Sequence, residues 1–505
     1  MNLDDTIVAL ATPLGRGGIG VVRIAGPEAR TIALPMLRLK HDLEPGRAVF
    51  GELIEPCGSD IPVRQDSKYA AGIPTREDAT DESDPKSTVG HDISRTGMAA
   101  PHSSMSSDQR IDEVVVTYFA KPHSYTTDDI IEISAHGSPV VLRHIVELAL
   151  ARGARLAEPG EFTMRAFLNG RIDLTQAEAV RDLIESQTLH QAKIAAQQLE
   201  GALSRRLQPV KQRLVGLIAV LEAGIDFAED DVSIMPSDQI LQHIAAIRSP
   251  LEELSRSFAY GKIVHEGLTL AIVGRPNVGK SSLFNRLVER ERAIVTASPG
   301  TTRDLVTETV AIGGIPVKLV DTAGIRRALD EAESFGIQKS MEVLADADLV
   351  LVVLDASQTP AEEDQELLRQ AAQRPAIVVE NKADLRCPCG SDTPVGQTSI
   401  PANLRTSALT GEGIPELRAV ILRHVTGEAG PSSESGFLTN ARHQSLVRDS
   451  LTALDAAQSA VGNRVPHEML LLDLYNALRP LDEITGATTN DDILNLIFSR
   501  FCIGK

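Results

Sequence analysis

The feature that most constrains the fold of this chain is a glycine-rich segment, Gly274 to Ser281, with the sequence GRPNVGKS. An apolar run, Leu268 to Val273, precedes it, and a helix-forming run, Ser282 to Leu287, follows it. This order of strand, loop and helix is typical of a phosphate-binding loop, whose glycines let backbone N–H groups surround a β-phosphate. In such a loop Lys280 reaches the β and γ oxygens, and the Ser281 hydroxyl ligates Mg²⁺. A structural turn is the alternative interpretation of the segment taken alone.

Two further predicted strands end in residues that complete a guanine nucleotide site. The run 317–320 is followed by Asp321-Thr322-Ala323-Gly324, which supplies a carboxylate for the metal and the Gly324 N–H for the γ-phosphate. The run 376–379 is followed by Asn381-Lys382-Ala383-Asp384. The Asp384 carboxylate can accept hydrogen bonds from guanine N1–H and the exocyclic amine, which adenine does not offer. The base is therefore predicted to be guanine.

Two loops complete the predicted site. Thr302 can join the magnesium shell when a γ-phosphate is present, and the backbone around Ser407 fits the loop that contacts the base edge. The ordered set predicts a protein that binds and hydrolyses GTP, with Lys280 and Thr302 in the catalytic machinery. The predicted GTP contacts are Asn277, Val278, Gly279, Lys280, Ser281, Ser282, Thr296, Ala297, Ser298, Pro299, Gly300, Thr301, Thr302, Asp321, Thr322, Ala323, Gly324, Asn381, Lys382, Ala383, Asp384, Ser407, Ala408 and Leu409.

The residue that would orient the attacking water is not the usual one. Ras-like enzymes place a glutamine directly after the glycine that corresponds to Gly324, whereas this chain has Ile325 there. Isoleucine cannot orient water, so another group must do so. Glu331 and Glu333 are the nearest downstream carboxylates, and their alternative role is that of a solvated charge run.

Composition limits the class of protein. A chain of 505 residues that is 42% hydrophobic can bury a sizeable core and is long enough for about three domains. We expect a cytoplasmic protein, because no apolar run reaches the roughly 18 residues of a membrane span and the four cysteines are scattered. The net charge of −19 argues against a protein that coats nucleic acid unaided.

The amino-terminal part has an α+β pattern. Between about 59 and 109 the sequence fills with Ser, Asp, Thr, Pro and Gly and loses its periodicity, which predicts a disordered insertion. Strand-like runs lie on both sides of it, and Pro139 opens a helix that ends near Gly153. The predicted strands cover 6–11, 19–24, 114–119 and 130–134.

Long helices are expected from Asp173 to about Gly261 and again from about Leu438. Thr175 and Glu178 have the spacing of a capping box at the start of the first helix. Helical blocks on both sides of an α/β block indicate a domain inserted into a helical one. The predicted fold class is a multidomain α/β plus α protein with an α+β N-terminal domain, a helical-bundle domain and an inserted P-loop, Ras-like GTPase domain.

Several segments together resemble the MnmE/TrmE family of tRNA-modification GTPases. They are 5–9, 13–18, the run from Pro159 to Leu174, the phosphate loop, Thr301 to Asp304 and the final residues Phe501-Cys502-Ile503-Gly504-Lys505. The resemblance covers nearly the whole chain except the insertion at 59–109 and a shorter one at 386–401. It implies a folate-binding and dimerisation domain at 1–170, a helical domain at 171–264 and 430–505, and a GTPase domain at 265–429.

The resemblance also implies a reaction and partners. The family acts with the flavoprotein MnmG, in a heterotetramer of two homodimerising chains and two partners. It installs aminomethyl or carboxymethylaminomethyl groups at C5 of the wobble uridine of certain tRNAs. The implied cofactors are GTP, Mg²⁺, K⁺ and 5-formyl- or methylene-tetrahydrofolate as one-carbon donor, with no membrane involved.

Individual residues carry these implied roles. Potassium would be held by Asn277, Thr296, Ser298 and Thr301, magnesium by Ser281 and Thr302, and the water by Glu333. Arg23, Glu132, Arg171 and Lys505 match folate-binding positions, although the family often has lysine where Arg171 stands, which keeps the charge and changes the geometry. Cys502 is either a reactive thiol near the folate or a small buried hydrophobe that ends a helix.

Two other functions remain open from the sequence. A ribosome-assembly GTPase would share the phosphate loop and the Thr-Thr-Arg run, but that class lacks a folate-type amino domain and the Cys-Ile-Gly-Lys ending. A folate-binding structural protein with a vestigial GTPase is disfavoured by the intact Lys280, Ser281, Thr302 and Asp321.

Overall fold

The computed structural model describes the chain in two compact units. The described residues are 4–13, 15–55, 109–226, 235–289, 307–321, 347–385, 404–426 and 436–488, together with 494, 497–499, 501–502 and 504. One unit comprises Met1–Arg171 with Asn495–Lys505, and the other comprises Ile172–Leu494. Apart from Gln109, which begins a strand, the insertions predicted at 59–109 and 386–401 lie outside the described residues.

The N-terminal unit is built on a seven-stranded sheet with the order β3-β4-β5-β6-β2-β1-β7. Its strands are β1 (Ile7–Leu10), β2 (Gly17–Ala25), β3 (Leu37–Leu39), β4 (Ala48–Glu55), β5 (Gln109–Phe119), β6 (Ile130–Gly137) and β7 (Arg155–Leu156), and its helices are α1 (Ala29–Ala33), α2 (Pro139–Ala151) and α3 (Glu161–Leu168). Ile133 of β6 and Ile145 of α2 lie in the same buried core. The strands predicted from apolar runs and the helix predicted at Pro139 are confirmed.

The C-terminal residues belong to this unit. The ring of Phe498 lies 6.5 Å from that of Phe167 and 5.5 Å from that of Phe501. A Cβ at Gly160 would lie 2.6 Å from the Phe498 carbonyl oxygen, so only glycine allows this approach. Residues 495–505 group with the N-terminal unit, whereas the sequence assigned them to the helical segment 430–505, and Phe498 packs against Phe167 of α3.

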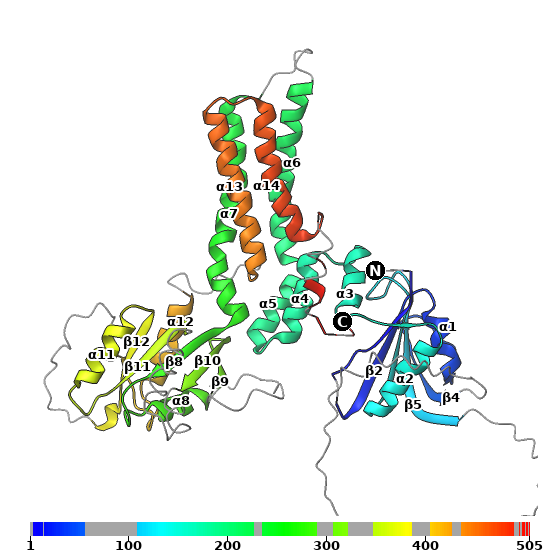
Figure 1. Ribbon diagram of the computed structural model, residues 1–505, viewed down its shortest axis with the longest axis horizontal. Coiled ribbons are helices and arrows are strands. Elements are labelled where there is room, and N and C mark those ends of the chain that lie inside the picture. Colours follow the sequence, from blue (N-terminus) through cyan, green and yellow to red (C-terminus); the bar gives the residue numbers. More distant parts are fainter. Residues whose placement is uncertain are drawn as a thin grey trace, which may run out of the picture. The chain divides into compact units, whose positions relative to one another are not determined.

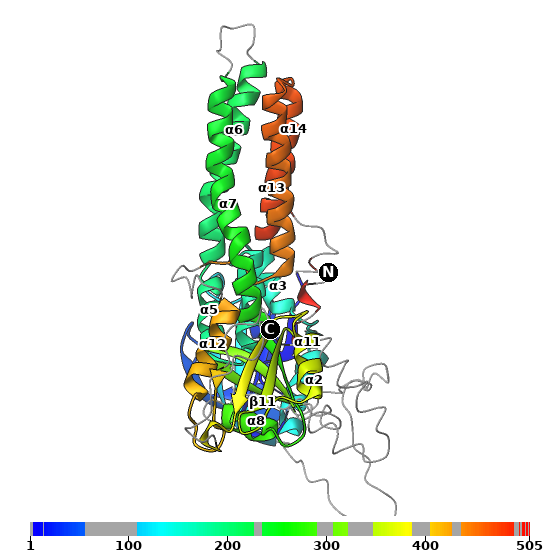
Figure 2. The same ribbon diagram turned by 90° about the vertical axis from the view of Figure 1, so that its left-hand side faces the viewer.

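The second unit contains a bundle of long helices that run side by side in both views (Figures 1 and 2). These are α6 (Ala202–Asp226), α7 (Ser237–Glu266), α13 (Ala441–Gly462) and α14 (His467–Thr485), and the shorter α4 (Leu174–Glu185) and α5 (Leu189–Leu199) precede them. Leu214, Leu251, Leu454 and Leu474 share one buried core. Each such leucine contributes roughly 1.5–3 kcal/mol of transfer free energy. Helices from both sides of the α/β segment thus form one core, as the inserted-domain fold requires.

The start of α4 is capped differently from the prediction. Asp173 is the N-cap residue, and its side chain accepts from the backbone N–H of Gln176, whose side chain binds back to Asp173. Thr175 and Glu178 therefore do not form the capping box, although their spacing matches one. Glu178 is instead buried and pairs with His443 Nε2 at 2.7 Å, so α4 is tied to α13 across the inserted segment.

The inserted segment carries a six-stranded sheet with the order β13-β12-β11-β8-β10-β9. Its strands are β8 (Leu268–Val273), β9 (Thr307–Ile312), β10 (Ile315–Asp321), β11 (Leu349–Asp355), β12 (Ala376–Asn381) and β13 (Leu404–Arg405), and its helices include α8 (Lys280–Val288), α11 (Glu362–Ala371) and α12 (Ile414–Thr426). The pairs are parallel except β9 with β10. Every residue of β11 is buried, as expected for a parallel strand covered on both faces. In the described part of the chain, no helix is both long and apolar enough to cross a bilayer.

Candidate nucleotide-binding site

Those predicted nucleotide residues that the structure describes gather at one edge of the six-stranded sheet. Strands β8, β10, β11 and β12 are mutually parallel, so their carboxyl ends meet at the same edge. The phosphate loop follows β8, Asp321 ends β10, Asp355 ends β11 and Asn381 ends β12. In open α/β sheets this edge is the place where ligands bind.

The phosphate loop has the backbone conformation that its glycines were predicted to allow. Gly279 has φ +94°, and a Cβ there would lie 2.3 Å from the Asn381 side-chain nitrogen. Asn277 also has a positive φ of 62°, a conformation that asparagine tolerates better than most residues. The Lys280 ammonium is buried and donates to the Gly274 and Arg275 carbonyls at 2.9 and 2.7 Å. Carbonyl groups of the loop thus hold the Lys280 side chain at the start of α8, and Ser281 is the next residue of that helix.

Asn381 joins the phosphate loop to the loop predicted to contact the base. Its side-chain nitrogen donates to the Val278 carbonyl at 3.0 Å, and its side-chain oxygen accepts from the Ala408 N–H at 3.0 Å. The side chain is only 1% exposed. A buried amide that satisfies both loops fixes their separation, because either unpaired group would cost about 1–3 kcal/mol.

Asp384 is oriented by a buried hydroxyl. The Ser407 hydroxyl donates to Asp384 Oδ1 at 2.6 Å, and the Thr410 N–H donates to the same hydroxyl oxygen at 3.1 Å. Ser407 is fully buried, whereas Leu409, two residues on, is 81% exposed. The sequence predicted only a backbone role for the loop around Ser407. The hydrogen bond from the Ser407 side chain to Asp384 was not predicted.

Asp355 is a residue of this edge that the sequence reasoning missed. Its carboxylate accepts from Lys382 Nζ at 2.7 Å and from the Ser357 hydroxyl at 2.6 Å. Burial alone would raise the pKa of Asp355, but these partners lower it below the ordinary value, so the carboxylate stays charged. The available signal was an aspartate directly after the apolar run 349–354, which is the same pattern as Asp321 after 317–320.

Arg275 of the phosphate loop is also fixed by a partner that the sequence did not indicate. Its Nε donates to Asp364 Oδ1 at 2.8 Å, and Asp364 is 1% exposed at the start of α11. The second oxygen of Asp364 accepts from the Ala361 N–H at 2.9 Å. The loop is therefore held on one side by α11 and on the other by Asn381.

Some predicted site residues lie outside the described residues. For Asp321 the structure gives the backbone at the end of β10 and no side chain. The roles predicted for the site residues outside the described part stay predictions. The residues outside the described part are Thr296, Ala297, Ser298, Pro299, Gly300, Thr301, Thr302, Thr322, Ala323, Gly324, Glu333 and Lys505.

The N-terminal unit brings the described folate candidates together. Arg23 of β2 and Glu132 of β6 are register partners, and Arg23 Nη2 lies 2.7 Å from Glu132 Oε1. The guanidinium carbons of Arg23 and Arg171 lie 5.9 and 5.5 Å from the centre of the Tyr125 ring. Burial raises the pKa of Tyr125, so this phenol is neutral near pH 7. The cluster combines two cations, one carboxylate and an aromatic ring.

The chain end lies beside this cluster. Arg23 Nη1 donates to the Gly504 carbonyl at 3.4 Å, and the Gly160 N–H donates to the Cys502 carbonyl at 3.4 Å. Cys502 is a free and exposed thiol. Its exposure is unlike that of a small buried hydrophobe, so the interpretation of Cys502 as a core residue is not favoured.

Comparison with known proteins decides the family. A family profile described as the MnmE helical domain matches residues 174–502, and one described as the GTP-binding protein TrmE N-terminus matches 6–83 and 76–171. The chain is 64% identical to the tRNA modification GTPase MnmE of Koribacter versatilis over 100% of both chains. The chain belongs to the MnmE family of tRNA modification GTPases.

Other MnmE relatives agree. Identity is 39% to the tRNA modification GTPase MnmE of Geotalea uraniireducens over 100% of both chains, and 38% to that of Aquifex aeolicus over 99% of this chain and 100% of the relative. The G domain of the FeoB iron transporter of T. maritima is 26% identical over 31% of this chain and 98% of its own, with a TM-score of 0.23. Family membership over the full length makes the chain a GTPase and leaves the ribosome-assembly alternative without support.

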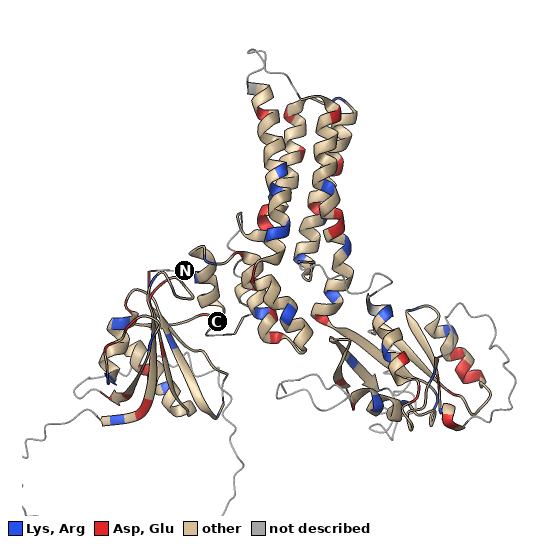
Figure 3. Cartoon of the chain, turned by 180° about the vertical axis from the view of Figure 1, so that it is seen from behind, with Lys and Arg blue, Asp and Glu red and all other residues tan. Residues whose placement is uncertain are grey.

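The basic residues of α6 in this MnmE-family member contact other residues of the helical bundle and do not form an unpaired basic surface. Lys211 Nζ pairs with Asp482 at 2.6 Å, and Arg206 lies 3.9 Å from Glu253. Arg213 donates to the Ala246 carbonyl at 3.2 Å. Figure 3 shows positions of both charge signs along the bundle helices. These contacts favour a solvated, paired face over a nucleic-acid contact.

Proposed function

We propose that this MnmE-family protein binds GTP at the carboxyl edge of the six-stranded sheet and uses its hydrolysis in tRNA modification. With the flavoprotein MnmG it would install an aminomethyl or carboxymethylaminomethyl group at C5 of the wobble uridine of certain tRNAs. The buried Asn381 amide is the observation that supports the nucleotide-binding part of the proposal. It hydrogen-bonds both to Val278 of the phosphate loop and to Ala408 of the loop predicted to contact the base. This link supports the proposal that Asp384 and Lys280 belong to one site.

The residues of this edge fit a magnesium-bound nucleotide. No cluster of three or more His, Cys, Asp or Glu side chains suited to a metal occurs among the residues that the structure describes. The ion would be held by the Ser281 hydroxyl and Thr302 together with phosphate oxygens, as is usual for Mg²⁺. When bound, it would neutralise charge on the β- and γ-phosphates. Lys280, at the first position of α8, would add its own charge beside the β-phosphate.

Potassium and Glu333 are proposed to complete the hydrolytic site. Asn277 is an exposed residue of the phosphate loop with a positive φ, and it would hold the cation together with Thr296, Ser298 and Thr301. A cation there supplies charge that an arginine finger gives in other GTPases. Glu333 would orient the water, since Ile325 cannot.

A tetrahydrofolate carrying a one-carbon unit is the proposed ligand of the N-terminal unit. The Tyr125 ring offers a stacking face, and the guanidinium groups of Arg23 and Arg171 offer donors to a polar heterocycle or carboxylate. Lys505 would add a further cation next to Gly504. The chain is also proposed to form a homodimer through this unit, in which Ile19 and Val140 are 70% and 78% exposed. We place the protein in the cytoplasm with its tRNA substrate.

Nucleoside analysis of tRNA tests the proposal. Cells that lack the gene should lose the C5 modification of the wobble uridine, and the wild-type gene should restore it. The Lys280→Ala variant should fail to restore it, whereas the matched surface variant Lys262→Ala should succeed. Unchanged modification in the deletion strain would reject the tRNA function, even if the purified protein hydrolyses GTP.

A further inference from the structure

The corner between α4 and α5, residues 182–191, contacts two separate parts of the nucleotide-binding segment. Thr188 Oγ1 donates to the Gly314 carbonyl at 2.6 Å, in the turn between β9 and β10. Gln191 Nε2 donates to the carbonyls of Val264 and His265, at 2.9 and 3.0 Å, at the end of α7. One short corner thus contacts the element before β8 and the turn before β10.

Both contacted elements lead directly to the predicted phosphate site. Only Gly267 separates the end of α7 from β8, which runs into the phosphate loop, and β10 ends at Asp321. In addition, α7 buries Leu251 in the bundle core and Val264 in the core of the six-stranded sheet. A shift of β8 or β10 relative to the bundle must therefore change the contacts of the corner.

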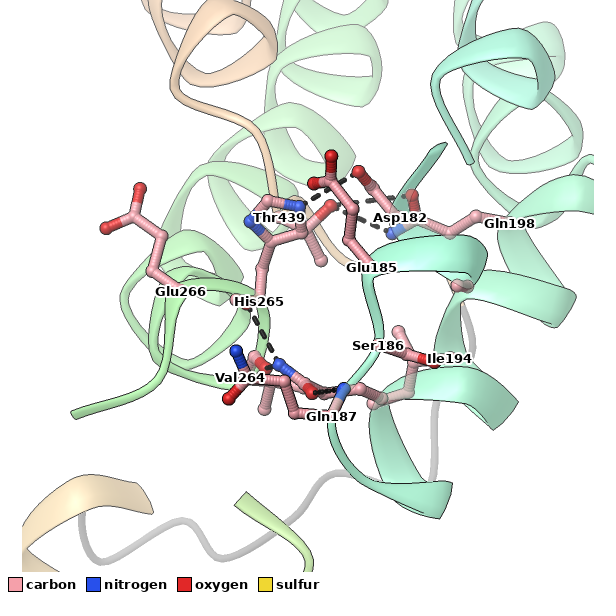
Figure 4. A pocket seen from close by; sticks show the side chains of 12 residues that line it. Asp182, Glu185, Ser186, Gln187, Ile194, Gln198, Val264, His265, Glu266 and Thr439 are labelled. Carbon is pink, nitrogen blue, oxygen red and sulfur yellow. Dashed lines mark hydrogen bonds and ion pairs between the residues drawn. The ribbon is translucent and has the colours of Figure 1, made fainter. Parts of the chain in front are cut away.

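The joint on the α7 side is polar and incompletely filled. Asp182 of α4 faces His265 of α7, with Oδ1 and Nε2 3.0 Å apart, at a cavity of about 330 Å³ (Figure 4). Charged, amide and hydroxyl groups line the cavity beside a few apolar side chains, Glu185, Gln187, Gln198 and Thr439 among the polar ones. Water can replace such hydrogen bonds, whereas a close-packed apolar joint resists sliding. This joint can therefore shift at low cost.

We propose that the α4–α5 corner is a positioning element that couples the nucleotide state of the sheet to the helical bundle, through Thr188 to the β9–β10 turn and through Asp182 and Gln191 to the end of α7. The inference rests on the proposed binding of GTP and deepens it. Thr188 carries the most specific contact, because its hydroxyl is the atom that joins the corner to the sheet.

Two substitutions at Thr188 separate coupling from helix capping. The hydroxyl also accepts from the Gln191 N–H as the N-cap of α5. Thr188→Ser keeps both the acceptor and the donor. Thr188→Asp keeps the acceptor for the cap but, as a carboxylate, has no proton to donate to Gly314. The pair therefore tests the contact to the sheet with the cap intact.

The measurement is hydrogen–deuterium exchange of the full chain with GDP and with the non-hydrolysable analogue GMPPNP. In the wild type and in Thr188→Ser, amides of residues 182–199 should exchange about fivefold differently in the two nucleotide states. In Thr188→Asp the difference should fall below about twofold, while the affinity for each nucleotide stays within about twofold. An undiminished difference in Thr188→Asp would overturn the proposal.

A second pair of variants controls for a general loss of stability that a strained substitution in the β9–β10 turn would cause. Gly313 and Gly314 both have positive φ, so alanine is strained at either position. A Cβ at Gly314 would lie 2.7 Å from His190 of α5, whereas one at Gly313 would meet Leu422 of α12. Only Gly314→Ala should alter exchange at 182–199, and an equal effect of Gly313→Ala would contradict the proposal. If the wild type binds neither nucleotide, the proposed function fails; binding without any change at 182–199 overturns the coupling alone.

Discussion

The side-chain amide of Asn381 donates to the Val278 carbonyl at 3.0 Å and so joins two segments that lie 103 residues apart in sequence. The same side chain accepts from Ala408, so one buried residue sets the distance between the groups predicted to hold phosphate and those predicted to hold guanine. The residues predicted to recognise guanine and those predicted to bind phosphate are thereby linked through one buried side chain.

Removing this link should weaken nucleotide binding. Asn381→Ala leaves the Val278 carbonyl and the Ala408 N–H unpaired in a buried place, which costs about 1–3 kcal/mol. We expect the dissociation constant for GDP, measured by calorimetry, to rise about tenfold to a hundredfold. Asn463→Ala, at an exposed helix end, is the matched control and should leave the constant unchanged. Equal affinities for the Asn381 variant and the wild type would show that the two loops do not depend on this amide.

Changing the base-recognition carboxylate should change the preferred base. In Asp384→Asn one oxygen becomes a donor, which suits the C2 carbonyl of xanthine better than the exocyclic amine of guanine. The affinity for GDP should fall by about tenfold or more, and the affinity for XDP should rise, in competition binding. Ser407→Ala should lower GDP affinity less, because it removes only the hydroxyl that orients Asp384. Unchanged GDP affinity in Asp384→Asn would reject the assignment of this residue.

The N-terminal cluster should bind a reduced folate. Arg23→Ala removes the guanidinium that pairs with Glu132 and lies over Tyr125. The affinity for 5-formyltetrahydrofolate should fall about tenfold or more, since hydrogen bonds to charged groups contribute about 1.5–3 kcal/mol. Arg47→Ala, whose side chain is 73% exposed, serves as the control. An unaltered isotherm for Arg23→Ala removes this residue from the folate site.

Lowering the pH should reduce the stability of the unit that contains the helical bundle, because it protonates Glu178. Burial alone would raise the pKa of this carboxyl, but the charges of His443 and Arg442 and their hydrogen bonds lower it from 4.5 to about 2. A depressed folded pKa stabilises the fold above the unfolded value, and this contribution is lost as the pH falls from about 5 toward 2. On the order of 3 kcal/mol is expected to disappear over that range.

Denaturant unfolding measured across that pH range tests this expectation. Glu178→Gln should lower the free energy of unfolding near pH 6 and flatten its fall below about pH 5. Glu253→Gln, in an exposed and long ion pair, should change neither. A Glu178→Gln variant with the acid sensitivity of the wild type would show that another group is responsible.

The parallel strands β8, β10 and β12 could be predicted because they are apolar runs, and they lie where the runs 268–273, 317–320 and 376–379 predicted them. The capping of α4 could not be decided from sequence. Asp173 and Thr175 are two positions apart, and each is followed three residues later by a Gln or Glu that could complete a capping box. The residue that becomes the N-cap depends on where the chain enters the helix, and in the structure it is Asp173.

The partners within the site were the least predictable part. Lys382 pairs with Asp355 and Arg275 with Asp364, although 27 and 89 residues separate the members of each pair. Motif spacing identifies residues that face the ligand, but it carries no information on side chains that hold them from a neighbouring strand or helix. Register explains why Arg23 and Glu132 meet, since they are directly opposed on β2 and β6.

Release of phosphate from GTP by the purified full-length chain, with Mg²⁺ and K⁺ present, is the decisive test of the proposed guanine-specific GTPase site. We expect steady turnover of GTP, little or none of ATP, and loss of turnover in Lys280→Ala. Equal hydrolysis of GTP and ATP, or no phosphate release from GTP by the wild type, would contradict a guanine-specific hydrolytic site at this edge of the sheet.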